Sequence, residues 1–181
     1  MSELTVGARY AKSLIDLAQE QNILEDVKKD MEFFIQVVKE NHELQAVLRN
    51  PIIGHDKKVK ILEAIFGTSV GKATIGFFKI MITKSRGEVL YYTAQEFINQ
   101  YNAKKNIIKA LVTSATPLSA ANMKSITDLV QAEVGGNIVL QTKVDPNLIG
   151  GFVLTVGDRQ VDTSIANSLK KLKTEFAQKA V

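Results

Sequence analysis

The sequence predicts an α+β protein of two domains, with an N-terminal all-α six-helix bundle over residues 1–105 and a small α/β domain over residues 106–181. Two observations lead to this prediction. The spacing of apolar residues changes near Asn106 from a helical period to the alternation typical of strands. Ten of the twelve aromatic residues also precede Asn106. A chain of 181 residues is long enough for two small domains.

Six amphipathic segments before residue 105 predict the helices of the bundle. Their apolar stripes lie within residues 7–18, 24–38, 44–48, 59–66, 75–82 and 90–101. The third helix must end before Asn50-Pro51, because a residue that precedes proline is pushed out of the helical region. We expect Gly67 to end the fourth helix as a left-handed cap and Ser69 to begin the fifth as its N-cap.

The second half mixes predicted strands with two helices. The strands are residues 107–114, 138–144 and 152–156, which are rich in β-branched residues or alternate apolar with polar ones. A helix begins after Ser119 and is closed by Gly135-Gly136, and a last helix follows Thr163 or Ser164. These elements predict a small α/β domain.

The composition excludes much of enzyme chemistry. The absence of cysteine rules out disulfides, thiolate nucleophiles and cysteine-based metal sites. The two histidines, His42 and His55, have no third ligand at metal-binding spacing. Residues 67–74 are similar to a phosphate-binding loop, which needs four residues between its glycines and a Ser or Thr after its lysine. Here only three residues separate Gly67 from Gly71, and Ala73 follows the lysine, so the motif is not met. We therefore expect no catalytic residues, no bound cofactor and no metal.

The basic excess is small and evenly spread. The net charge is +4, and each half carries +2. Two lysine runs, 57–60 and 170–173, are interpreted as solvated polar faces of amphipathic helices. A basic RNA-associated accessory protein with an α/β binding domain stays open as the alternative function. No secretory signal or membrane-spanning stretch is visible.

The first and fifth predicted helices are apolar over more than one narrow stripe. Residues 75–82 place apolar side chains around most of a helix circumference. Such a helix is either buried on all sides or presents one side to a partner. Both interpretations stay open at this point, the second being a groove that accepts an amphipathic helix.

The stretch VDPNLIGGFVLTVGDRQVDTSIANSLKKL, residues 144–172, closely resembles the C-terminal motif of the delta subunit of bacterial F-type ATP synthases. The oligomycin-sensitivity-conferring protein is the mitochondrial relative of that family. The N-terminal ARYAKSLIDLA is similar to the family's opening helix. Glycines, a proline and short polar residues in the C-terminal motif suit turns and helix caps, so we expect them to build the domain. They are Asp145, Pro146, Gly150, Gly151, Gly157, Asp158, Asp162 and Ser164.

The resemblance implies a non-catalytic stator subunit that links the catalytic head to the peripheral stalk, so that proton transport drives ATP synthesis. It implies that residues 1–105 receive the N-terminal helix of an alpha subunit and that residues 106–181 engage the C-terminal end of the b subunit. It implies one copy in each complex, on the cytoplasmic face of the bacterial membrane. The subunit would be held at the membrane only through the complex, and it would not bind nucleic acid. The positions that match the family's helix groove are Tyr10, Ser13, Gly76, Lys79 and Ile80.

Overall fold

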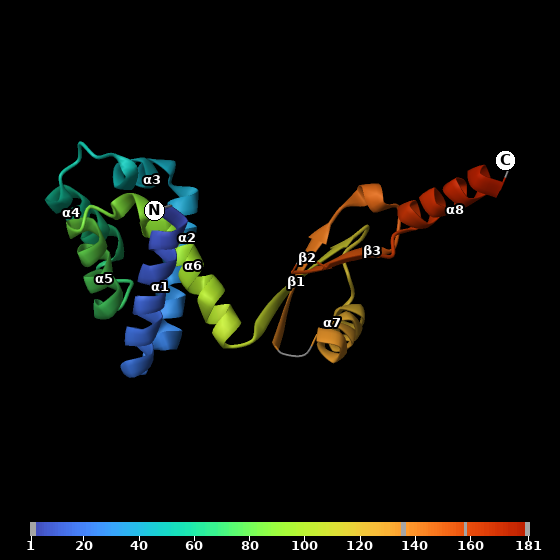
Figure 1. Ribbon diagram of the computed structural model, residues 1–181, viewed down its shortest axis with the longest axis horizontal. Coiled ribbons are helices and arrows are strands. Elements are labelled where there is room, and N and C mark those ends of the chain that lie inside the picture. The colour runs from blue at the N-terminus through green and yellow to red at the C-terminus, as the bar shows by residue number, and fades with distance from the viewer. Residues whose placement is uncertain (1–2, 135–136, 158, 180–181) are drawn as a thin grey trace. The chain divides into compact units, whose positions relative to one another are not determined.

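The computed structural model describes residues 3–134, 137–157 and 159–179. The chain is mostly helical with one small mixed sheet, which confirms the coarse fold class (Figure 1). It divides into two compact units, Met1–Asn102 and Ala103–Val181. The first unit contains α1 (Glu3–Glu20), α2 (Leu24–Glu40), α3 (His42–Arg49), α4 (His55–Phe66), α5 (Lys72–Thr83), η1 (Gly87–Val89) and most of α6 (Leu90–Lys104). The second contains β1 (Ile107–Ser114), α7 (Ala120–Val134), β2 (Asn137–Val144), η2 (Pro146–Leu148), β3 (Phe152–Val156), β4 (Arg159–Asp162) and α8 (Ile165–Lys179).

The core of the first unit contains an aromatic cluster from α2, α4 and α5. Phe34, Phe66 and Phe78 are fully buried members of the apolar stripes of these helices. Their ring centroids lie 4.7 Å apart for Phe34 and Phe78, 5.4 Å for Phe34 and Phe66, and 6.2 Å for Phe66 and Phe78. Each aromatic pair contributes about 0.5–1.5 kcal/mol beyond the burial of its area, so the cluster stabilises the packing of the three helices.

Among the described residues, α1, α5 and α6 are each followed by a non-glycine residue in the left-handed conformation, which is Asn22, Ser85 and Asn106 respectively. After α1, Asn22 has φ 57°, its N–H donates to Gln19 O, and the N–H of Ile23 donates to Ala18 O. Ser85 has the same φ after α5. The paired bonds after α1 form a Schellman motif, which satisfies carbonyls that the helix leaves without partners. The predicted left-handed cap at Gly67 is wrong: φ there is −56°, because the chain continues in a right-handed turn.

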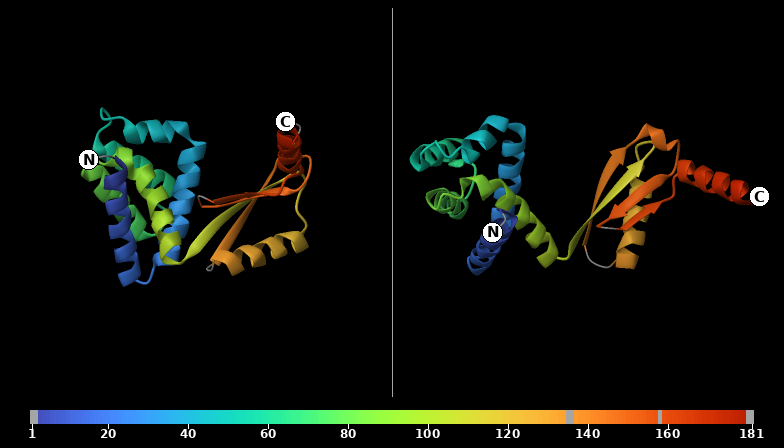
Figure 2. Two further views of the ribbon diagram at one scale, coloured as in Figure 1. Left: turned by 45° about the vertical axis from the view of Figure 1, so that its right-hand side comes forward. Right: turned by 45° about the horizontal axis from the view of Figure 1, so that its top comes forward.

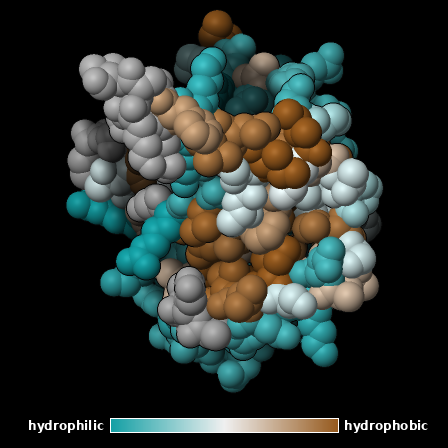
Figure 3. All heavy atoms as spheres, turned by 90° about the vertical axis from the view of Figure 1, so that its right-hand side faces the viewer, coloured by the Kyte–Doolittle hydropathy of each residue, from teal (hydrophilic) through white to brown (hydrophobic). Residues whose placement is uncertain are grey.

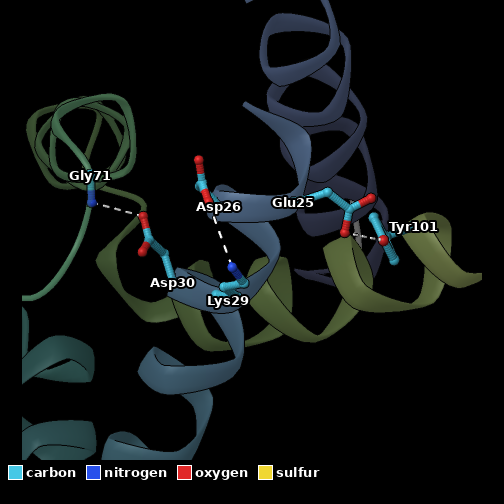
Figure 4. A network of polar contacts seen from close by, with 6 residues as sticks. All are labelled: Glu25, Asp26, Lys29, Asp30, Gly71 and Tyr101. Atoms are coloured by element: carbon cyan, nitrogen blue, oxygen red, sulfur yellow. Dashed lines mark hydrogen bonds and ion pairs between the residues drawn. The ribbon is translucent and has the colours of Figure 1, made fainter. Parts of the chain in front are cut away.

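The predicted start of α5 at Ser69 is also wrong. Helix α5 begins at Lys72 with Gly71 as N-cap, and glycine has no side chain with which to cap it. The cap comes instead from α2, where Asp30 Oδ2 accepts the N–H of Gly71 at 2.8 Å (Figure 4). The same oxygen accepts the hydroxyl of Thr74 at 2.6 Å. A carboxylate from another helix therefore determines where α5 begins.

The second unit is a four-stranded sheet in the order β2-β1-β3-β4, with α7 on one face (Figure 2). Strand β1 pairs in parallel with β2 and antiparallel with β3. A parallel pair needs a crossover, which α7 provides. Val112 of β1 packs with Ile126 and Val130 of α7 in the core of this unit. As predicted, Ser119 caps α7, its Oγ accepting the N–H of Asn122 at 3.2 Å.

Strand β4 is absent from the prediction. Its four residues contain one apolar side chain, Val161, so they show no alternation. The strand forms because β3 offers an edge, and its register pairs Thr155 with Gln160. Gly157, with φ 58°, supplies the left-handed position in the turn between the two strands. The predicted helix end at Gly135-Gly136 and the motif residue Asp158 lie outside the described residues.

Candidate partner-binding surfaces

Helices α1 and α5 contribute the first candidate surface, called the α1–α5 surface. Tyr10 of α1 contacts Phe77 of α5 edge to face, with ring centroids 6.5 Å apart. Ile80 is 56% exposed, although it is an isoleucine in the middle of the unit's most apolar helix. Ser13 is exposed, and its hydroxyl donates to Arg9 O at 3.0 Å. A Cβ added to Gly76 would meet no atom within 4 Å, so the space above this glycine is open.

Lys79 is oriented toward α4. Its Nζ lies 2.5 Å from Glu63 Oε1, and both side chains are about half exposed. The ion pair connects α4 with α5, and it contributes at most about 1 kcal/mol because water screens it. Tyr10 is thus in ring contact with α5, whereas Lys79 is engaged with α4.

The glycine-rich motif builds the base of α8. Gly151 has φ 77°, and a Cβ there would lie 2.5 Å from Thr163 O. A Cβ on Gly150 would lie 2.6 Å from Ile165 Cδ1, and the N–H of Ile165 donates to Gly150 O at 3.1 Å. The backbone of Thr163 and Ser164 leaves no room for a Cβ at Gly151, so only glycine permits the close approach of the loop to the start of the helix there.

Polar side chains complete the same junction. Asp145 Oδ1 accepts the N–H of Asn147 at 3.0 Å, and Pro146 opens the short η2 helix. At the start of α8, Asp162 Oδ1 accepts the N–H of Ser164 at 2.9 Å. Ser164 Oγ accepts the N–H of Asn167 at 3.2 Å, as an N-cap does. The hydrogen bonds from Ser164 lower the pKa of the Asp162 carboxyl, and the motif residues described here make structural contacts.

Helix α8 carries the second candidate surface, called the α8 stripe. Four apolar side chains at spacings of 4, 3 and 4 define it: Ile165, Leu169, Leu172 and Phe176. All four are about half exposed or more, and Phe176 is 71% exposed. The spacing indicates an amphipathic helix, but only the structure shows that the stripe is left uncovered. Apolar side chains are also visible at the surface in Figure 3.

The other motifs show no catalytic arrangement. Within the described residues, no three His, Asp or Glu side chains gather as a metal site, and no helix is long and apolar enough to cross a membrane. His42 and His55 are exposed first residues of α3 and α4. One interpretation is wrong: Lys58 of the 57–60 run is buried and donates to Leu48 O at 2.8 Å. That run is therefore not a wholly solvated face.

The chain is similar to known ATP synthase subunits over its whole length. A family model described as ATP synthase delta (OSCP) subunit matches residues 6–176. The ATP synthase subunit delta of Cytophaga hutchinsonii is 39% identical and covers 100% of this chain and 99% of its own. That of Chlorobaculum tepidum is 35% identical, with 96% of each chain covered.

A solved structure shares the fold. A chain in the Toxoplasma gondii mitochondrial ATP synthase hexamer superposes with a TM-score of 0.69 at 23% identity, covering 94% of this chain and 97% of that one. The resemblance seen in the C-terminal motif is thereby extended to both units. The family predicted from the sequence is confirmed, and the chain belongs to the ATP synthase delta (OSCP) subunit family.

Proposed function

We propose that the chain is a stator subunit that joins the catalytic head of an F-type ATP synthase to its peripheral stalk and resists the torque of the rotor. In this role residues 1–105 receive the N-terminal helix of an alpha subunit, and residues 106–181 engage the C-terminal end of the b subunit. One copy serves each complex, on the cytoplasmic face of the bacterial membrane. The observation that carries the proposal is the family match over residues 6–176, which includes both compact units.

The α1–α5 surface supports the proposal for the first unit. An amphipathic helix binds where apolar side chains are exposed and ordered before it arrives. More than two fifths of the surface of Ile80 and of Leu17 is exposed. The contact with Phe77 holds Tyr10 beside α5. The open space above Gly76 allows the backbone of a partner helix to approach α5 closely.

Titration calorimetry of the full chain with a peptide copying the alpha subunit's N-terminal helix tests this assignment. Ile80→Asp should remove most of the binding, because it places a charge in an apolar contact. Ile52→Asp is the matched control, since Ile52 is 90% exposed in the loop between α3 and α4. Absence of saturable binding up to about 100 μM peptide, or equal loss in both variants, would contradict the proposed surface.

The α8 stripe supports the proposal for the second unit. An exposed apolar stripe on an amphipathic helix is the surface that another helix, such as the end of a stalk protein, covers. Leu169→Asp should weaken binding of a peptide that copies the C-terminal end of the b subunit. Leu129→Asp on α7 should not, although Leu129 is exposed to a similar extent. If both variants bind the peptide as well as the unaltered chain, the α8 stripe is not the stalk contact.

A further inference from the structure

A cavity of about 160 Å³ lies in the first unit, between the end of α3, the start of α4 and the segment that follows α5. Its polar lining comes from Arg49, His55, Lys58, Ser85 and Glu88. Three of these residues are basic, one is a hydroxyl and one is a carboxylate. The volume corresponds to roughly five water molecules at about 30 Å³ each, so a small oxyanion fits with some of its water.

Lys58 is the unusual member of this lining. Its side chain is buried, with the residue 7% exposed, and its ammonium donates to Leu48 O at 2.8 Å. An ammonium has three N–H donors, and Leu48 O is the single acceptor that it meets among the described residues. Burial lowers the pKa of Lys58, and the charge of Glu88 opposes that shift. A charged group in such a place is stabilised by an anion that uses its other donors.

The neighbouring groups are held in position by their own contacts. Arg49 Nη2 donates to Tyr92 Oη at 3.2 Å, and its guanidinium lies 5.9 Å from the centre of the Tyr92 ring. His55 Nε2 lies 3.3 Å from Ser85 Oγ. A Cβ on Gly87 would lie 3.2 Å from Leu48 O and 3.8 Å from Lys58 Nζ, so glycine keeps the lining open beside the ammonium.

We propose that this cavity binds a phosphate oxyanion, with Lys58 and Arg49 as cationic donors and Ser85 as a neutral donor. Glu88 provides selectivity. Monohydrogen phosphate carries a proton that it can donate to a carboxylate, whereas sulfate at neutral pH has none and is repelled. The phosphate is either free or the terminal group of a nucleotide, bound in its monoprotonated form, and the remainder of the nucleotide would extend outside the cavity. This site is distinct from the α1–α5 surface and the α8 stripe, and the proposal does not depend on the stator function.

Amide NMR of the full chain, titrated with inorganic phosphate at constant ionic strength, tests the proposal. We expect saturable shifts at the amides of Ser85, Gly87 and Glu88. Lys58→Met should weaken binding by at least about tenfold, since a hydrogen bond to a charged group is lost. Lys57→Met is the matched control, because Lys57 is exposed on the same helix and does not line the cavity. If Lys58→Met fails to fold, Arg49→Gln at an exposed position carries the same expectation.

Further arms of the titration test selectivity and source. Sulfate should produce no saturable shift with the unaltered chain. Glu88→Gln should reduce the difference between the affinities for phosphate and sulfate, because the negative charge that repels sulfate is removed. Tighter binding of ADP than of phosphate would assign a nucleotide as the source, and weaker binding would assign free phosphate. The proposal is overturned if phosphate gives no saturable shift at tens of millimolar, or if folded Lys58→Met binds it as well as the unaltered chain. Equal binding of sulfate by the unaltered chain would remove the role of Glu88.

Discussion

Replacing Asp30 with alanine should destabilise the first unit, because α5 has no capping side chain of its own. The change removes the acceptor for the N–H of Gly71, at 2.8 Å (Figure 4). It also removes the acceptor for the hydroxyl of Thr74, at 2.6 Å. A lost N-cap costs about 1 kcal/mol. Thr74 is fully buried, and leaving its hydroxyl without a partner costs about 1–3 kcal/mol. We therefore expect a loss of about 2–3 kcal/mol in the free energy of unfolding, or about 10 °C or more in the melting temperature.

Urea and thermal unfolding, followed by circular dichroism at the helical band, measure this loss. Amide hydrogen exchange over Lys72–Thr83 locates it in α5. Asp26→Ala is the matched control on the same helix. Asp26 pairs with Lys29 at 3.8 Å, but both side chains are about three-quarters exposed, so the change should stay within about 0.5 kcal/mol. Equal stability of the two variants, or unchanged exchange in α5, would refute the reasoning.

Four further predictions concern Tyr101 and the glycines. The hydrogen bond from Tyr101 to Glu25, 2.7 Å long, raises the pKa of the phenol to about 12. The hydrogen bond contributes fully to the free energy of unfolding below pH 10, and this contribution is lost as the pH rises toward 12. When the free energy of unfolding in urea is plotted against pH, Tyr101→Phe should therefore remove the decline between pH 10 and 12. Gly151→Ala should cost at least about 2 kcal/mol, because φ is 77° and the Cβ would collide with Thr163 O. Gly157→Ala, at φ 58° but in open space, should cost only about 1 kcal/mol in the same melting experiment. Gly76→Ala should raise the stability by up to about 1 kcal/mol, because α5 gains helix propensity without a clash, and an unchanged or lower melting temperature would contradict this.

Elements with local signals could be predicted from the sequence. Helix α3 ends at Arg49, before Asn50-Pro51, and the cap of α7 is Ser119. The steric effect of a proline and the hydrogen bond of an N-cap both act between residues a few positions apart, so the local sequence is enough to predict these helix ends. The apolar stripe of α8 was visible for the same reason, through its helical spacing.

Features that depend on distant residues could not be predicted. The start of α5 was misplaced because its cap comes from Asp30, 41 residues before Gly71. Strand β4 was missed because pairing with β3, rather than its own composition, holds it extended. The run of lysines predicts a solvated face because such runs are usually exposed, whereas Lys58 is buried and its ammonium donates a hydrogen bond to Leu48 O near the end of α3.

The sequence by itself determined the family, the coarse α+β class and the positions of most helices and strands. These follow from periodicity, from local turn and cap residues, and from a motif whose glycines suit close backbone contacts. Only the tertiary structure decided which side chains remain available to partners. Ile80 and the α8 stripe are exposed because no other element covers them among the described residues. Lys79 is oriented toward Glu63, and Lys58 is buried, because of the helices that pack beside them. Burial is a property of the packed chain, and no local pattern contains it.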